Sequence, residues 1–279
     1  MRLFTRALYT KHPYRLSMIG EAARIGQIQS PELATFYERI AVPENLSIAV
    51  VGDVDPSEIV DRFGEQLAGF GSGRTFEMPD VPVEPPVGSP RMVSVPKTRE
   101  QVHLALGFLG ASLQDEQRFA LELIASALSG QGGRLFLELR DKQGLAYSVT
   151  AFSQEALDPG YFCVYMATDP KKRERALDGI RTELEKLCRE GLTADELARN
   201  QRQIVGSFEI DLQRGSTRAA NMAFNDRYGL GFQDYREYPK RILAVTRDQI
   251  VDAARRYIDL DRSVLAIVGP DAEQKLATA

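Results

Sequence analysis

The sequence lacks several features that would place it in a specialised class of protein. It contains no tryptophan, two cysteines and two histidines among 279 residues. Cys163 and Cys188 lie far apart and belong to no Cys-x-x-Cys pair, so neither a disulfide framework nor a thiolate zinc site is predicted. We expect both cysteines to be thiols in the core.

Long apolar runs and basic blocks are missing as well. No stretch approaches the roughly 20 apolar residues of a membrane-spanning helix, and the first residues carry basic side chains without the apolar core of a signal peptide. The 35 basic and 39 acidic residues give a net charge of −4, and no basic cluster is long enough to follow a phosphate backbone. We therefore expect a soluble protein that binds neither membranes nor nucleic acids, and the sequence leaves its compartment, cytoplasmic or periplasmic, open.

The chain is long enough for more than one domain. A chain of 279 residues exceeds the usual size of a single domain, and 43% apolar residues suffice for a packed core. Residues 69–96 are rich in glycine and proline, which predicts an extended segment without regular structure. We place a linker at residues 71–90, between a first part at residues 1–70 and a domain at residues 91–279.

Periodic apolar patterns predict an α+β fold. The two strands on either side of the Asp-Pro-Gly turn at residues 158–160 form a hairpin, and hence part of an antiparallel sheet. The helix that starts at Ser30 should bury Leu33, Phe36, Tyr37 and Ile40. The principal predicted helices are residues 30–42, 55–67, 115–128, 169–190 and 193–208, and the predicted strands are residues 46–51, 102–108, 145–152, 161–167 and 264–268.

The last helix and strand repeat an earlier pair. A shift of 217 residues lays residues 30–52 on residues 247–269 without a gap, and Arg39, Ala49 and Gly52 meet identical residues. Helix, loop, strand and final glycine coincide, which predicts a duplicated fold unit. Because the second copy starts near Arg91, the first would start near 91 − 217 = −126, so we expect a first copy that is incomplete by about 126 residues.

The stretch at residues 130–152 concentrates the candidate chemistry. Its sequence is Gly-Gln-Gly-Gly-Arg-Leu-Phe-Leu-Glu-Leu-Arg-Asp-Lys-Gln-Gly-Leu-Ala-Tyr-Ser-Val-Thr-Ala-Phe. The apolar spacing after the glycines predicts a short helix that ends at Gly144, and a strand follows. Arg140 therefore lies near the end of the helix and Tyr147 near the start of the strand. The glycines do not indicate a phosphate loop, because they follow a helix and lack the Gly-Lys-Ser/Thr ending.

This corner resembles the second-domain signature of the pitrilysin/insulinase zinc peptidases, a family that includes the mitochondrial processing peptidases. Two further pieces resemble the same family, namely the His-Pro-Tyr sequence at residues 12–14 and the run from Pro43 to Val54. The pieces stand in the family's order and span nearly the whole chain.

The resemblance implies two homologous α+β domains, each an antiparallel sheet covered by helices on one face, which enclose peptides in a chamber. In the family, the first domain carries the inverted zinc motif His-x-x-Glu-His and a further Glu ligand. The second domain is metal-free, and its Arg and Tyr hold the substrate and polarise the scissile bond. Arg140 and Tyr147 match these two residues and are seven positions apart, as the motif requires.

The sequence departs from the family where the metal would lie. Neither His12 nor His103 is followed by the Glu-His of the inverted motif, so no metal ligand and no complete catalytic set is predicted in this chain. We expect both histidines to be structural. Zinc is expected in the full enzyme or in a partner subunit.

The resemblance therefore predicts the substrate-binding, non-metal half of a zinc metallopeptidase that hydrolyses extended peptides, inactive by itself. Its expected partners are a peptide, added to a sheet edge, and a domain or subunit bearing His-x-x-Glu-His, in a homo- or hetero-oligomer. The half domain before the linker should expose strand edge and apolar surface, so we expect it to associate with itself or to dock on a partner.

Two alternatives remain open. The chain could be a non-catalytic scaffold or assembly subunit of the same family. Arg140 could instead be an exposed arginine near Glu138 or Asp141, with Tyr147 packed on the sheet.

Overall fold

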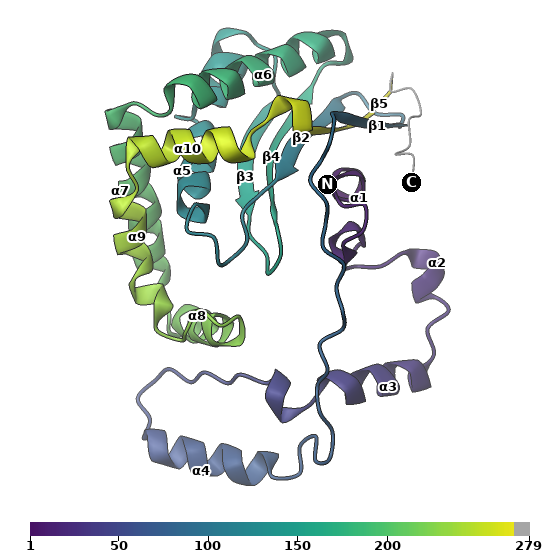
Figure 1. The fold of residues 1–279 in the computed structure, drawn as a ribbon, viewed down its shortest axis with the longest axis vertical. Helices are drawn as coiled ribbons and strands as arrows, with labels where there is room; N and C mark the ends of the chain where they lie inside the picture. Colours follow the sequence, from purple (N-terminus) through teal and green to yellow (C-terminus); the bar gives the residue numbers. More distant parts are fainter. Residues whose placement is uncertain (271–279) are drawn as a thin grey trace. The chain divides into compact units, whose positions relative to one another are not determined.

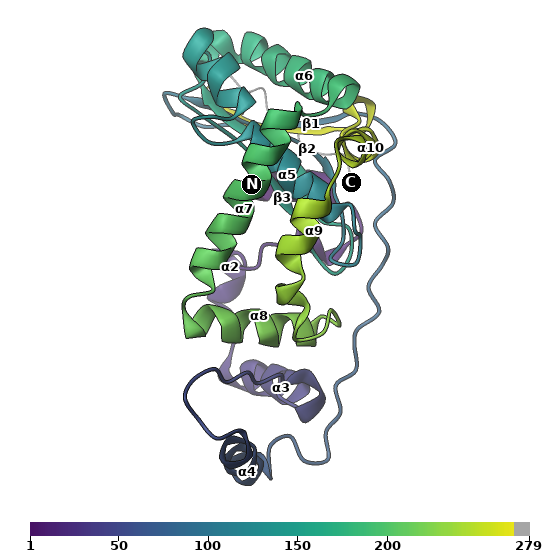
Figure 2. The same ribbon diagram turned by 90° about the vertical axis from the view of Figure 1, so that its left-hand side faces the viewer.

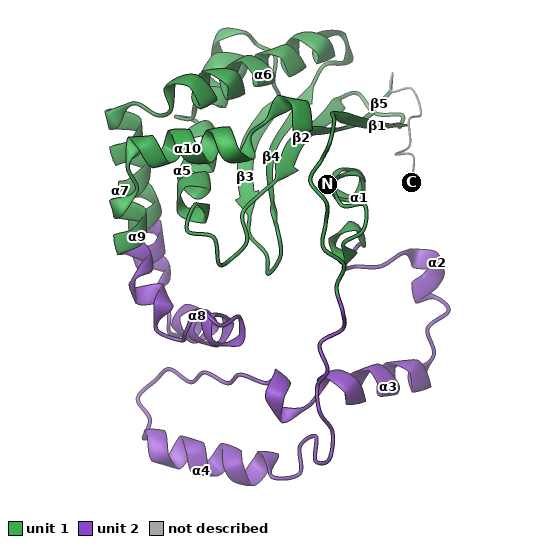
Figure 3. Ribbon diagram, viewed as in Figure 1, with its two compact units in different colours: residues 1–16, 81–205, 240–279 green, residues 17–80, 206–239 purple. Residues whose placement is uncertain are grey.

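The computed structural model describes residues 1–270, which form two compact units (Figure 3). The first unit takes in residues 1–16, 81–205 and the described chain from residue 240 onward, and the second takes in residues 17–80 and 206–239. Each unit thus joins segments that are distant in the sequence.

The first unit is built on a five-stranded sheet with the order β1-β5-β2-β4-β3 (Figure 1). The pairs β2–β4, β2–β5 and β3–β4 are antiparallel, as predicted, whereas β1 runs parallel to β5. The α+β class is confirmed, and the sheet differs from the prediction by this one parallel edge. The strands are β1 (Arg91–Pro96), β2 (Val102–Leu109), β3 (Ser148–Gln154), β4 (Tyr161–Thr168) and β5 (Val264–Gly269).

Strand β1 corrects the prediction that residues 69–96 contain no regular structure. The backbone N–H of Arg91 donates to the carbonyl of Ser263 at 2.9 Å, and that of Lys97 donates to Gly269 at 2.9 Å. Because β1 is an edge strand, the missing N–H of Pro96 at its end can be tolerated on the side without a neighbour. The proline content of residues 69–96 therefore did not prevent residues 91–96 from forming a strand.

Helices cover one face of the sheet, and one further helix packs against the other face. In Figure 1, α10 lies between α5 and α6 and contacts both, and Figure 2 gives the same helices after a quarter turn. The α-helices that lie wholly in this unit are α1 (Arg2–Leu8), α5 (Arg118–Leu128), α6 (Arg173–Glu190) and α10 (Arg247–Tyr257). The α-helices that lie partly or wholly in the second unit are α2 (Ala22–Ile25), α3 (Ser30–Ile40), α4 (Pro56–Leu67), α7 (Ala194–Asp211), α8 (Gly215–Arg227) and α9 (Tyr238–Ala244). No helix within residues 1–270 is both long enough and apolar enough to cross a membrane.

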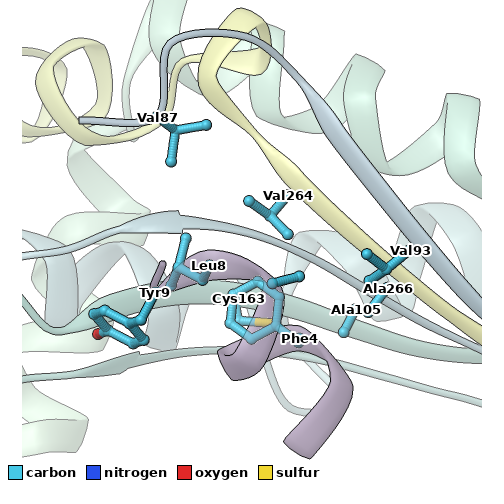
Figure 4. Packing of buried hydrophobic residues seen from close by; sticks show 10 residues of the cluster. Phe4, Leu8, Tyr9, Val87, Val93, Ala105, Cys163, Val264 and Ala266 are labelled. Carbon is cyan, nitrogen blue, oxygen red and sulfur yellow. The ribbon is translucent and has the colours of Figure 1, made fainter. Parts of the chain in front are cut away.

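The core under α1 was not predicted. Phe4 and Leu8 are fully buried against Ala105, Cys163 and Ala266 of the central strands, as Figure 4 shows. Cys163 is thus a core thiol, as expected, and burial raises its pKa to about 12. Alternate strand residues such as Leu104 and Leu106 are buried as well and belong to the opposite, helix-covered face. The sheet is therefore covered on one face by α5, α6 and α10 and over part of the other face by α1.

The predicted buried strand at residues 46–51 is wrong. This segment is in no strand, and Leu46, Ile48 and Val50 are 41%, 48% and 44% exposed. A strand needs hydrogen-bonding neighbours, and within residues 1–270 no strand pairs with this segment. The apolar face predicted for α3 is also exposed, with Phe36 at 57% and Tyr37 at 58%.

The repeat at an offset of 217 residues is nevertheless visible in the helices. Helix α3 (Ser30–Ile40) maps onto α10 (Arg247–Tyr257), and the 3-10 turn η2 (Pro43–Asn45) maps onto η6 (Leu260–Arg262), with identical lengths. Both helices begin with a capping box, whose first residues, Gln29 and Thr246, are also 217 apart. The two copies thus agree in local structure and differ in the strand that follows.

Candidate functional site

The corner predicted from residues 130–152 begins with a π-helix, η3 (Phe136–Lys142). The sequence predicted a short helix here, and the wider turn is an addition from the structure. Gly144 adopts φ +61°, a conformation that favours glycine, and its N–H donates to the carbonyl of Arg140 at 3.1 Å. The N–H of Leu145 then donates to the carbonyl of Leu139 at 2.7 Å. The chain is thereby turned from η3 into β3.

Arg140 and Tyr147 both extend from this corner without polar partners. The Arg140 side chain is exposed, and its guanidinium carbon lies 4.8 Å from the ring centre of Phe136. Tyr147 is 70% exposed, while its backbone N–H donates to Ala167 at 2.9 Å. Within residues 1–270 neither side chain makes a hydrogen bond or an ion pair. Two donors are therefore available to a ligand from a fixed backbone.

The acidic neighbours of Arg140 are not its partners. Glu138 instead accepts a hydrogen bond from Lys142 at 2.6 Å, one turn along η3. Glu138 is thus paired with Lys142, while Arg140 beside it is exposed. Two more contacts hold the turn, because Lys172 donates to the carbonyl of Gly144 at 2.9 Å and Thr168 donates to that of Leu145 at 2.6 Å.

A largely buried ion pair anchors the start of the corner. Nε and Nη2 of Arg134 each lie 2.6 Å from one carboxylate oxygen of Glu196, and Nη2 also donates to the carbonyl of Gly191 at 2.9 Å. Burial by itself would raise the pKa of Glu196, but the hydrogen bonds from Arg134 and from the N–H of Thr193 outweigh it and lower the pKa to about 2. Arg134 thus ties η3 to the junction between α6 and α7.

The free edge of β3 is closed at its centre. The hydroxyl of Ser129 accepts from the N–H of Ala151 at 2.7 Å and donates to the carbonyl of the same residue at 2.7 Å. Because β4 pairs with the other side of β3, these are the outward groups that an added strand would use. A peptide strand therefore cannot pair with β3 along its whole length.

The two histidines lie apart and do not form a metal site. Nδ1 of His12 accepts from the N–H of Tyr14 at 3.2 Å, and its Nε2 lies 3.1 Å from Asp158. Nδ1 of His103 lies 2.7 Å from the hydroxyl of Tyr165. In the part of the chain that the structure describes, no three His, Cys, Asp or Glu side chains could hold a metal together. The described residues therefore do not fit a zinc ion.

A cavity of about 460 Å³ opens at the far end of the sheet, beside Phe108 and Tyr257. Its charged groups have partners within the chain. Asp115 accepts from Tyr257 and lies 3.3 Å from Arg256, and Arg262 lies 3.4 Å from Asp259. Glu84 and Asp158 pair with the segment at residues 10–12. His103 shares a register row with Ser148, at the start of β3, whereas Phe108 lies at the opposite end of β2. The cavity is thus separate from the corner with Arg140 and Tyr147.

Several residues of the site were missed by sequence reasoning. The Arg134–Glu196 pair joins residues 62 positions apart, although Arg134 belongs to the recognised corner and Glu196 to the helix predicted at residues 193–208. Ser129 directly precedes the glycine-rich entry, and no local pattern links it to Ala151, 22 residues away. These contacts form only in the folded chain, so no local sequence pattern indicates them.

Comparisons with known proteins show what this chain is similar to. The family model for the peptidase M16 inactive domain matches residues 27–204. An uncharacterized zinc protease of Mycobacterium bovis is 29% identical over 280 residues, which cover 98% of this chain and 63% of that protein. The chain thus spans less than two thirds of the length of this relative.

Two solved structures have the same fold. A protease from Helicobacter pylori has a TM-score of 0.85 and 22% identity, and the match covers 95% of this chain and 65% of that one. A peptidase M16 inactive domain from Pseudomonas fluorescens also has a TM-score of 0.85, with 23% identity over 98% of this chain and 65% of that one. At these identities the likeness concerns the fold.

Proposed function

Because the chain belongs to the family of the peptidase M16 inactive domain, we propose that it is the substrate-binding, metal-free half of a zinc-dependent metallopeptidase. It holds extended peptides against a zinc site that a different domain or subunit carries. By itself it neither binds zinc nor hydrolyses peptide bonds.

The observation that carries this proposal is the pair of unpartnered donors, Arg140 and Tyr147, on one anchored corner. A guanidinium and a phenol can both donate to the carbonyl oxygen of a bound peptide. These hydrogen bonds strengthen as negative charge develops on that oxygen, so they favour the transition state over the bound substrate. The chemistry that a bound zinc ion supplies is an activated water molecule.

The closed edge of β3 refines how the peptide is held. Since the hydroxyl of Ser129 occupies the outward N–H and carbonyl of Ala151, the peptide contacts this chain through side chains at the corner. The main chain of the peptide pairs with a sheet edge of the partner that carries the zinc site. The peptide is thus still bound as an added strand, on the partner's sheet.

The repeat supports the proposal that the partner completes a second fold unit. Ile250, Ala253 and Ala254 of α10 are fully buried, whereas their equivalents on α3, at an offset of 217, are Leu33, Phe36 and Tyr37, each more than half exposed. We accordingly propose that residues 1–70 are the C-terminal part of a first peptidase-like domain, of which α1 packs on the sheet of the second domain. Residues 71–90 are then the linker and residues 91–279 the second domain. The partner covers the apolar face of α3 in a homo- or hetero-oligomer or as a further part of one chain.

Metal content and peptide cleavage test the proposal. The purified chain should contain no stoichiometric zinc and should cleave no peptide, and cleavage should appear when a domain bearing His-x-x-Glu-His is added. Stoichiometric zinc together with turnover in the isolated chain would refute it.

A further inference from the structure

The helix that carries Arg140 needs external support. A π-helix is rare and usually limited to a single turn, and η3 is held by contacts with β3 and α6. Leu139, next to Arg140 in η3, is 1% exposed, while Arg140 itself is exposed. Consequently the buried side of η3, and Leu139 above all, determines where Arg140 is presented.

Leu139 packs against a position in α6 that has no side chain. A Cβ built on Gly179 would lie 2.6 Å from Cδ2 of Leu139, closer than non-bonded carbon atoms approach, so the Leu139 side chain or η3 itself must shift to admit it. Gly179 lies inside the 18-residue helix α6, where glycine is less favourable than alanine. The missing side chain at residue 179 thus forms a notch that receives Leu139.

We infer that Gly179 is a positioning residue for Arg140, because its notch sets how closely η3 approaches α6. This inference rests on the proposed function, in which Arg140 contacts the peptide. Gly179 itself touches neither the peptide nor the zinc site. Its action passes through Leu139 to the adjacent Arg140.

The opposite expectation follows if Gly179 has no such role. Replacement of a helical glycine by alanine then strengthens α6 and leaves the corner unchanged, because alanine is the better helix former. Gly206 in α7 provides the matched control, since a Cβ there would meet nothing within 4 Å. Gly179→Ala and Gly206→Ala are therefore the same chemical change with and without a neighbour.

Amide hydrogen exchange of the full 279-residue chain, measured without any ligand, shows whether the turn at the end of η3 is intact. The amides of Gly144 and Leu145 donate to the carbonyls of Arg140 and Leu139, so they report on the turn that ends η3. Gly179→Ala should speed their exchange about tenfold, and Gly206→Ala should leave it unchanged. Equal protection in the two variants overturns the inference.

Peptide binding provides the second readout, with fluorescein-labelled β-casein as an extended polypeptide probe. Gly179→Ala should weaken binding about tenfold, comparable to Arg140→Ala, and Leu139→Val combined with Gly179→Ala should restore most of the affinity because it removes a methylene group at the contact. If Arg140→Ala has no effect, the proposed function fails. If Arg140→Ala weakens binding and Gly179→Ala does not, this inference alone fails.

The double variant also covers the case in which Gly179→Ala does not fold. Circular dichroism of each variant shows whether α6 and the sheet form. Recovery of fold and binding in the Leu139→Val, Gly179→Ala chain supports the notch. A chain that stays unfolded or unable to bind after this change contradicts it.

Discussion

Arg134 contacts both carboxylate oxygens of Glu196, with Nε and Nη2 at 2.6 Å, and this pair is largely shielded from solvent. It joins the entry of the candidate corner to the start of α7. Removal of one partner leaves the other charge buried and unpaired, which is the costly way to break such a pair.

The first prediction concerns Glu196→Gln. A fall of the Glu196 pKa from 4.5 to about 2 corresponds to roughly 3 kcal/mol of stabilisation, and we expect the substitution to lower the free energy of unfolding by about that amount. Urea unfolding at pH 7 measures it. Glu190→Gln, in an exposed pair with Arg189, is the control and should change the stability little.

The same pair predicts a dependence on pH. Because the folded-state pKa of Glu196 is depressed, its stabilisation is fully present above pH 4.5 and is lost as the pH falls towards 2. The stability of the wild-type chain should therefore decline more steeply over this window than that of Glu196→Gln. Parallel curves for the two proteins would contradict the assignment.

A further prediction concerns Glu84, whose carboxylate accepts four hydrogen bonds from Thr10, Lys11 and His12, at 2.8 to 2.9 Å. Burial opposes ionisation, but these bonds outweigh it and lower the pKa of Glu84. Glu84→Gln should cost about 1–3 kcal/mol and release the segment, so that trypsin cuts after Lys11. The exposed Glu77→Gln is the control, and equal trypsin resistance of the two variants would count against this anchor.

Arg140→Ala and Tyr147→Phe should separate binding from stability. Both side chains are exposed and lack polar partners within residues 1–270, so thermal unfolding should be unchanged. Binding of fluorescein-labelled β-casein should weaken about tenfold for each. Arg181→Ala, on the exposed side of α6, serves as the control. Unchanged binding in both variants would favour the scaffold alternative.

The apolar face of α3 predicts association. The wild-type chain should sediment as more than a monomer at high concentration, and Phe36→Asp should shift it towards the monomer, because Phe36 is 57% exposed. The equivalent change on α10, Ala253→Asp, should prevent folding, since Ala253 is fully buried. A monodisperse wild-type monomer would argue against the uncovered face as an interface.

Sequence patterns predicted those elements whose neighbours lie within the chain. Strands β2, β4 and β5 occur within one residue of the predicted positions, because continuous apolar runs between turn residues leave few alternatives. The same reasoning failed for residues 46–51. An apolar run shows that a segment can be a strand, but only a neighbouring strand makes it one.

The candidate site was predictable only in part. The spacing of Leu135, Phe136 and Leu139 predicted a short helix but could not distinguish a π-helix, since both place these side chains on one side. The family resemblance singled out Arg140 and Tyr147. Neither Gly179 nor Ser129 could be identified beforehand, because each acts on a residue that is distant in the sequence and close in the fold.

The most direct test of the account is peptide cleavage by the chain reconstituted with a zinc-bearing His-x-x-Glu-His domain. The pair should cleave an extended peptide, neither part should do so alone, and Arg140→Ala in this chain should lower kcat more than it raises KM, because the contact strengthens in the transition state. Full activity of the zinc-bearing domain without this chain, or undiminished cleavage with Arg140→Ala, would contradict the assignment of this chain as the substrate-binding half.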